Sequence, residues 1–156
     1  MSKVQTEQFE VLTVSAQWVA YRRVTCPVDK IGETITAPDV YPGIYDLAKK
    51  HGVKAGPPYA RYISWRGPDC DILCGVPLSS PIPPENNIIV DLYTACRLVS
   101  YTFVGPYSRL NEAHDTVAVY MKDNNLRQGG PCWEIYDGPP NEEGIATTHV
   151  CYAIEP

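Results

Sequence analysis

Along the chain, apolar residues either recur at helical spacing or alternate with polar ones, and the two patterns predict different elements. Residues 43–52 (GIYDLAKKHG) show the first pattern: Ile44 and the positions three, four and seven residues later share one helical face. Pro42 has a backbone angle that suits a first helical turn, and Gly52 supplies a stop. This stretch therefore predicts an amphipathic helix.

A second helical stretch, residues 108–125 (SRLNEAHDTVAVYMKDNN), follows the turn sequence VGPY. Ser108 is a candidate N-cap, because its hydroxyl can accept a hydrogen bond from a backbone N–H of the first turn. A single apolar stripe on this helix predicts that it also covers a surface. The stripe consists of Leu110, Ala113, Val117, Tyr120 and Met121.

Most of the remaining chain alternates or is rich in β-branched and aromatic residues, which predicts strands. The longest of these runs, residues 88–104, is expected to hold two strands. Together with the two helices, the runs predict a strand-rich α+β protein. They cover residues 9–16, 18–26, 59–65, 70–78, 88–104, 132–136 and 149–154.

The chain contains an internal repeat. Residues 48–62 (AKKHGVKAGPPYARY) align with residues 122–136 (KDNNLRQGGPCWEIY) at one offset, as matched prolines (131 − 57 = 74) and tyrosines (136 − 62 = 74) show. Upstream, VAYRRV resembles VSYTFV, and downstream ILCGVP resembles HVCYAI at a larger offset. These matches pair Tyr21 with Tyr101 and Cys74 with Cys151.

The repeat predicts how the domain is organised. Residues 1–156 form a single domain of two halves, roughly 8–78 and 88–156, joined by the proline-rich linker 79–87. Each half has the order strand, helix, strand, strand, and neither can bury its sheet face alone. We expect the two units to form one antiparallel sheet with both helices on one face, a pseudo-twofold axis and a central ligand groove.

Charge and composition argue against several classes of protein. The net charge of −5 argues against a protein that grips phosphate backbones, so no direct nucleic-acid binding is expected. The first residues lack the apolar core of a signal peptide, and no run reaches the length of a membrane span, so we expect a cytoplasmic protein. The six cysteines include no CxxC pair and are interpreted as dispersed thiols rather than as a metal site.

Four motifs, in order, resemble the gyrase-inhibitory-protein-like (GyrI-like) effector-binding domains, which are also appended to AraC-type and MerR-type multidrug regulators. The motifs are GPPYARY, DCDILCGVP, GPYSRL before the second helix, and GPCWEIY, and the resemblance spans the chain from about Val11 onward. It implies the duplicated fold inferred above, with a groove between the halves for bulky, often cationic and aromatic small molecules. It also implies that Glu134 lies in that groove, and it implies no cofactor.

Strand alternation assigns faces around this glutamate. Cys132, Glu134 and Tyr136 point one way, while Trp133 and Ile135 point the other. If the latter two face the helices, Glu134 faces the groove. The first repeat has alanine at the equivalent position (134 − 74 = 60), so the fold unit itself does not require the acid.

The candidate ligand residues surround Glu134 in this interpretation. A carboxylate among rings needs a cation or hydrogen bonds to stay charged, and a ligand ammonium would satisfy it. The alternative is that Glu134 pairs with Arg61 or Arg109 or points to solvent. The ligand-binding candidates are Glu134, Tyr136, Trp133, Tyr21, Tyr62 and Tyr101.

Three functions remain open. The first is a stand-alone module that senses or sequesters a hydrophobic cation; with about ten residues before the first strand, the chain is not expected to read DNA itself. The second, suggested by some family members, is a hydrolase of strained cyclopropane-bearing natural products, with Glu134 as general acid or base. The third is inhibition of DNA gyrase through protein contacts.

His114 is interpreted as a packed or surface histidine, because its sequence neighbours Glu112 and Asp115 do not face it on a helix.

Overall fold

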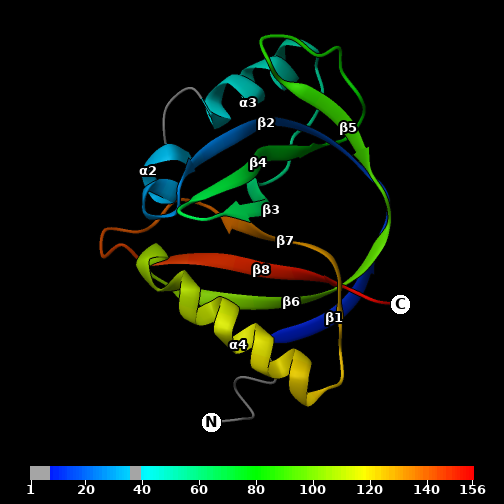
Figure 1. Cartoon of the computed structure of the whole chain (residues 1–156). Coiled ribbons are helices and arrows are strands. Elements are labelled where there is room, and N and C mark those ends of the chain that lie inside the picture. Colours follow the sequence, from blue (N-terminus) through cyan, green and yellow to red (C-terminus); the bar gives the residue numbers. More distant parts are fainter. Residues whose placement is uncertain (1–7, 36–39) are drawn as a thin grey trace. The chain divides into compact units, whose positions relative to one another are not determined.

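The computed structural model describes residues 8–35 and 40–156, without the side chains of residues 64–66. The chain divides into two compact units. We call residues 15–95 the first-repeat unit, and strand β1 (Phe9–Val14) together with residues 96–156 the second-repeat unit. Each unit is built on four antiparallel strands with helices (Figure 1).

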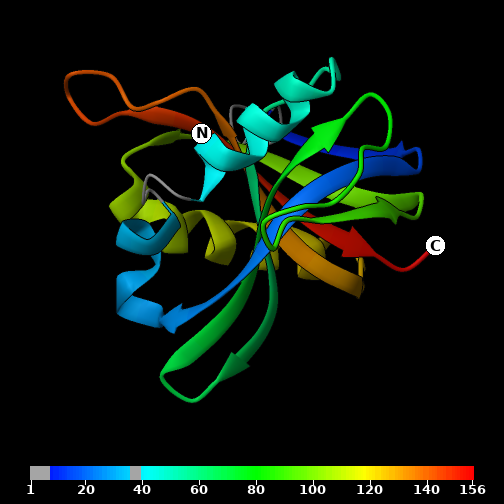
Figure 2. The same ribbon diagram turned by 90° about the horizontal axis from the view of Figure 1, so that it is seen from above.

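In the first-repeat unit the strand order is β3-β4-β2-β5. The β3–β4 hairpin closes through a short turn at Gly67 and is the long green hairpin of Figure 2. The elements are β2 (Gln17–Pro27), the 3-10 turn η1 (Val28–Lys30), α2 (Ile31–Ile35), α3 (Tyr41–Lys50), β3 (Tyr59–Arg66), β4 (Asp69–Leu78) and β5 (Ile89–Tyr93).

Helix α3 confirms the first predicted helix. Its apolar face buries Ile44, Leu47 and Ala48 against β4, and Pro42 lies in its first turn as expected. Gly52 ends the helix with a φ of 66°, a left-handed conformation that costs glycine little. Ile82 from the predicted linker packs into the same core, so this segment contributes to the unit's interior.

In the second-repeat unit the order is β1-β6-β8-β7, and α4 packs against this sheet. The apolar stripe predicted for the helix packs into the core with Val99 and Val150, which confirms the second helix. The elements are β1 (Phe9–Val14), β6 (Cys96–Gly105), the 3-10 turn η2 (Tyr107–Arg109), α4 (Leu110–Asp123), β7 (Gln128–Asp137) and β8 (Ala146–Ile154).

Two local predictions about helices were wrong. Ser108 does not cap α4: it lies inside η2, and Arg109 occupies the N-cap position without a side-chain cap. The extended backbone of Pro106 starts a 3-10 turn first, which places Ser108 within that turn. The structure also contains α2, a third helix of only 5 residues, which is too short to produce a periodic signal.

The strands are distributed differently from the predicted halves. β1 lies in the first half of the sequence but pairs with β6, in the register Phe9↔Tyr101. β5 follows the linker but pairs with β2, in the register Gln17↔Tyr93. Each unit therefore gains its fourth strand from the other half of the sequence, because strand pairing depends on distant contacts that local spacing does not encode.

The duplication itself is confirmed, with one shift of alignment. Ala60 lies opposite Cys74 in the β3–β4 ladder, whereas Glu134 lies opposite Val150 in the β7–β8 ladder. Val150, rather than Cys151, is therefore the counterpart of Cys74. The predicted α+β class of duplicated antiparallel units holds.

Candidate functional site

The buried carboxylate of Glu134 marks the candidate site. Glu134 lies on β7 and is 4% exposed, which makes it one of three buried polar residues in the described part of the chain. Its side chain points toward α4, where His114 meets it. Trp133 and Ile135 therefore point to the opposite face, the reverse of the conditional prediction. A carboxylate is tolerated beside the helix because that helix supplies a hydrogen-bonding partner.

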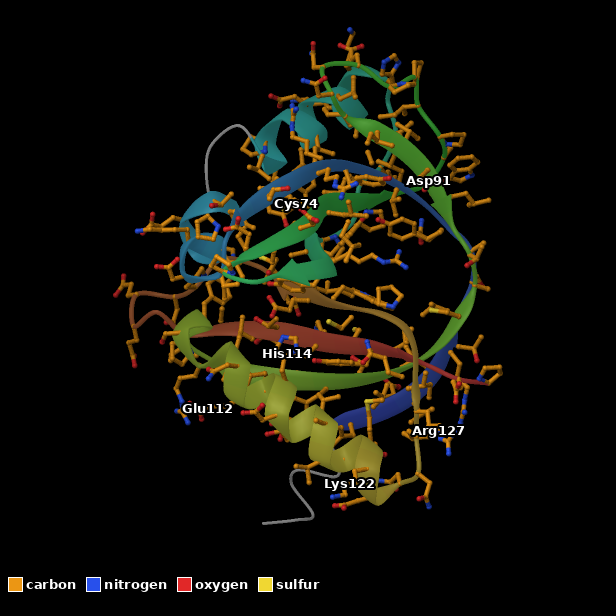
Figure 3. All side chains as sticks on the ribbon, viewed as in Figure 1. Cys74, Asp91, Glu112, His114, Lys122 and Arg127 are labelled. Carbon is orange, nitrogen blue, oxygen red and sulfur yellow. The ribbon has the colours of Figure 1, made fainter. Side chains whose placement is uncertain are left out.

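Two side chains hydrogen bond to the two carboxylate oxygens. His114 Nε2 lies 2.7 Å from Glu134 Oε2, and the Tyr136 hydroxyl donates to Oε1 at 2.7 Å. Tyr136 is itself 7% exposed, whereas the side chain of His114 is 22% exposed. Of the two hydrogen-bonding partners, His114 is therefore the more exposed. Figure 3 labels His114 on α4, with Glu112 on the outer side of the same helix.

Two further tyrosines complete the group that we call the Glu134 cluster: Glu134, His114, Tyr136, Tyr152 and Tyr107. The Tyr152 hydroxyl lies 2.6 Å from His114 Nδ1, so hydrogen bonds run from β8 through α4 to β7. The Tyr107 ring packs edge-on against Tyr136, with 5.6 Å between centroids. All five members belong to the second-repeat unit.

Burial and the negative charge of Glu134 both raise the pKa of two nearby tyrosines. Burial raises the pKa of Tyr107, and the Glu134 charge raises it further. Burial likewise raises the pKa of Tyr152, with smaller contributions from Cys132 and Glu134. Both hydroxyls therefore keep their protons at neutral pH and can act as donors.

The contacts are compatible with an arrangement in which the Glu134 carboxylate accepts from the Tyr136 hydroxyl and from His114 Nε2–H, while His114 Nδ1 accepts from the Tyr152 hydroxyl. In this state the cluster carries one net negative charge, enclosed by aromatic rings. Such a group can attract a cation, or it can move a proton through an imidazole that a carboxylate orients.

A buried hydroxyl beside the cluster lacks a partner. Thr148 is 0% exposed and lies opposite Tyr136 in the β7–β8 ladder. Its Oγ1 finds no hydrogen-bond partner within residues 8–35 and 40–156. Buried polar atoms are normally satisfied, so Thr148 offers a hydrogen bond that a bound molecule could use.

Two of the predicted ligand residues lie in the same unit but outside the Glu134 cluster. Tyr101 lies on β6 on the same sheet face as Glu134, with Val150 of β8 between them, and its ring stacks on Phe9 at 4.6 Å. Trp133 lies half-buried on the opposite face of β7, across from Cys151. Only Tyr136 joins Glu134 as the sequence suggested. Ligand contact by Tyr101 and Trp133 stays a prediction.

Tyr21 and Tyr62 belong to the first-repeat unit, so their contact with a ligand of Glu134 also stays a prediction. Tyr62 is buried on β3, and Tyr21 lies half-buried on β2 with its ring 6.2 Å from that of Tyr93. Tyr93 also accepts a hydrogen bond from Tyr59 at 2.9 Å. The guanidinium carbon of Arg61 lies 4.0 Å from the centre of the Tyr93 ring.

Of the two arginines considered as partners of Glu134, Arg109 is accounted for, whereas pairing with Arg61 stays a prediction. Arg109 binds Glu112 through two hydrogen bonds of 2.8 and 2.9 Å on the surface of α4, so it is engaged elsewhere. His114 was the partner that the sequence analysis missed. A signal was present, because His114 stands four residues after Leu110 and three before Val117, on the apolar stripe of the helix.

Within the part of the chain that the structure describes, no group of three or more His, Cys, Asp or Glu residues could hold a metal ion. None of the described helices is long and apolar enough to cross a membrane.

Replacing Tyr136 with phenylalanine is expected to lower the free energy of unfolding by about 1.5 kcal/mol, because the buried Glu134 carboxylate loses a hydrogen-bond donor. Urea unfolding followed by fluorescence measures the change. Tyr120→Phe is the matched control, since the Tyr120 ring stacks on Phe9 at 3.9 Å and the substitution keeps that ring. Equal stability of the two variants would contradict the expected role of the Tyr136 hydroxyl.

Comparisons with known proteins identify the fold. No family model and no curated protein sequence matches the chain. The C-terminal domain of EcmrR superposes with a TM-score of 0.79 at 17% identity, covering 95% of this chain and 97% of that one. The chain therefore has the fold of that domain, which is consistent with the GyrI-like resemblance.

Two other structures share the fold at lower similarity. SAV2435, solved bound to tetraphenylphosphonium, matches with a TM-score of 0.60 and 11% identity, over 94% of this chain and 93% of that one. A structure described as a hydrolase from Listeria innocua matches with a TM-score of 0.66 and 14% identity, over 95% and 92%.

Proposed function

We propose that the protein binds a bulky hydrophobic cation at the Glu134 cluster, and that it senses or sequesters such compounds. The observation that carries this proposal is the 4% exposed carboxylate of Glu134 enclosed by Tyr136, Tyr152 and Tyr107. Within the second-repeat unit its neighbours are the hydrogen-bonding side chains of Tyr136 and His114. A ligand cation would gain Coulomb attraction to the carboxylate and attraction to the ring faces.

The chemistry of the cluster favours a delocalised cation over a primary ammonium. Both carboxylate oxygens already accept hydrogen bonds, at 2.7 Å each. An ammonium group needs acceptors for its three N–H bonds, whereas a quaternary or phosphonium cation needs only charge and apolar contact. The tetraphenylphosphonium bound by SAV2435, which shares the fold, is a cation of this kind.

A titration with tetraphenylphosphonium tests the proposal. We expect the midpoint of thermal unfolding to rise with ligand concentration, because a ligand that binds only the folded state stabilises it by mass action. Calorimetry should give one site per chain. An apolar, uncharged analogue such as tetraphenylmethane, added as a soluble derivative, serves as the control. Equal shifts with both compounds, or none with either, would refute binding driven by the carboxylate.

A second candidate function is hydrolysis, and one observation favours it. The Glu134 carboxylate orients His114 through Nε2, so that Nδ1 could accept a proton from a water molecule in place of the Tyr152 hydroxyl. The fold is shared with a protein described as a hydrolase. The substrates would be strained cyclopropane-bearing natural products, as the GyrI-like resemblance suggests. Product formation at a small molar fraction of protein, followed by chromatography, separates turnover from stoichiometric binding.

A further inference from the structure

Two buried thiols of the first-repeat unit lie directly opposite each other. Cys26, near the end of β2, and Cys70, near the start of β4, form a register pair of the antiparallel ladder. They are 6% and 0% exposed. In the sequence they are 44 positions apart (70 − 26 = 44), so only the fold brings them together.

The backbone geometry suits a disulfide between them. Directly opposed residues of antiparallel strands lie about 4.5–5.5 Å apart at Cα, within the range of about 4.4–6.8 Å that disulfides span. Their Cβ atoms, about 4.5–5.5 Å apart in such pairs, must close to about 3.5–4.5 Å. The next register pair, Pro27↔Asp69, is the last of this ladder, so the strand end can make that small adjustment.

No other cysteine of the chain has a cysteine across from it. Cys74 lies opposite Arg22 and Ala60, and Cys151 lies opposite Trp133 and Ser100. The two remaining thiols, Cys96 and Cys132, lie opposite Val14 and Tyr152. Since all six cysteines are free thiols, the pair of Cys26 and Cys70 is singled out by its register.

We propose that Cys26 and Cys70 are a modification site, at which hydrogen peroxide closes a cross-strand disulfide. The sulfur of one thiol attacks a peroxide oxygen, the O–O bond breaks, and a sulfenic acid and one water form. The second sulfur then attacks the sulfenic sulfur, an S–S bond forms, and the S–O bond breaks to release a second water. Two electrons pass from the two sulfurs to the peroxide, and the two thiol protons leave in the waters.

The surroundings of the pair set the conditions for this reaction. Burial raises the pKa of Cys70 to about 11, and the adjacent Cys26 thiol and the carboxylates of Asp71 and Asp69 add to this effect. The thiolate is the reactive form, so oxidation is slow at neutral pH and accelerates about tenfold per pH unit below that pKa. Burial also keeps larger reagents out, which favours a small oxidant.

Peroxide treatment of the reduced protein, followed by alkylation under denaturing conditions and mass spectrometry, tests the proposal. We expect two of the six thiols to escape alkylation, the protein to lose the mass of two hydrogen atoms, and one cross-linked peptide pair to contain Cys26 and Cys70. A dithiol reductant should restore all six thiols. The oxidised protein should also unfold at a higher temperature, because the cross-link restricts the unfolded chain.

Matched variants separate the pair from the other thiols. Cys26→Ser and Cys70→Ser should each retain every remaining thiol under the same treatment, whereas Cys74→Ser should still form the cross-link. Retention of all six thiols by the wild type, a cross-link between other cysteines, or oxidation of single sulfurs to sulfinic acid would each overturn the proposal.

Discussion

Glu134→Gln is expected to weaken the binding of tetraphenylphosphonium by about 30-fold or more, which corresponds to about 2 kcal/mol. The substitution preserves the size of the side chain and an acceptor for the Tyr136 hydroxyl, but it removes the charge. Because Glu134 is 4% exposed, water screens that charge weakly, and its loss is felt directly by the cation. Isothermal titration calorimetry of both proteins measures the difference.

The control for this experiment is Glu112→Gln, which removes a carboxylate from the exposed surface of α4. It should leave the affinity within about twofold, since exposed charges are screened by solvent. Circular dichroism and the unfolding midpoint of Glu134→Gln show whether the protein remains folded. A folded Glu134→Gln protein with wild-type affinity would disprove the role of the carboxylate, even if the protein binds the cation.

Local signals made α3 and α4 predictable. Proline at the start of α3, glycine just after it and a regular apolar stripe are all encoded within a few residues. The repeat was equally visible, because its matched tyrosines occupy corresponding strands, Tyr62 on β3 and Tyr136 on β7. In contrast, the exchange of β1 and β5 between the units depends on pairing between distant segments, which spacing along the chain does not report.

The site shows the same division between local and distant information. Strand alternation, which is local, placed Glu134 and Tyr136 on one face, and the GyrI-like resemblance singled out Glu134 as a ligand residue. Sequence analysis missed His114, because a helix residue and a strand residue 20 positions apart (134 − 114 = 20) meet only after α4 packs on the sheet. It also missed the pair of Cys26 and Cys70 for the same reason. Polar residues on an otherwise apolar helical stripe are therefore the signal that sequence analysis of this fold should follow.

Alkaline pH is expected to destabilise the protein strongly. Burial raises the pKa of Cys74 from 9.0 to about 12, and burial has the same effect on Cys151. Each neutral buried thiol contributes stability that is fully present below pH 9.0, the pKa of the thiol in the unfolded chain. This stability is lost as the pH rises through the pKa of the thiol in the folded protein. A rise of three pKa units corresponds to roughly 4 kcal/mol for each thiol.

The sign follows from proton release: above about pH 9 the unfolded chain ionises its thiols while the folded protein keeps them neutral, so unfolding releases protons and becomes easier as the pH rises. Urea unfolding at several pH values should show a slope of about 1.4 kcal/mol per pH unit for each such thiol. The double variant Cys74→Ala, Cys151→Ala lacks two of these thiols. The pH dependence of its free energy of unfolding should therefore be less steep by about 1.4 kcal/mol per pH unit for each thiol removed, whatever its stability at neutral pH. An equally steep loss in this variant would assign alkaline unfolding to other buried groups whose pKa burial raises, such as Cys70 and Tyr59.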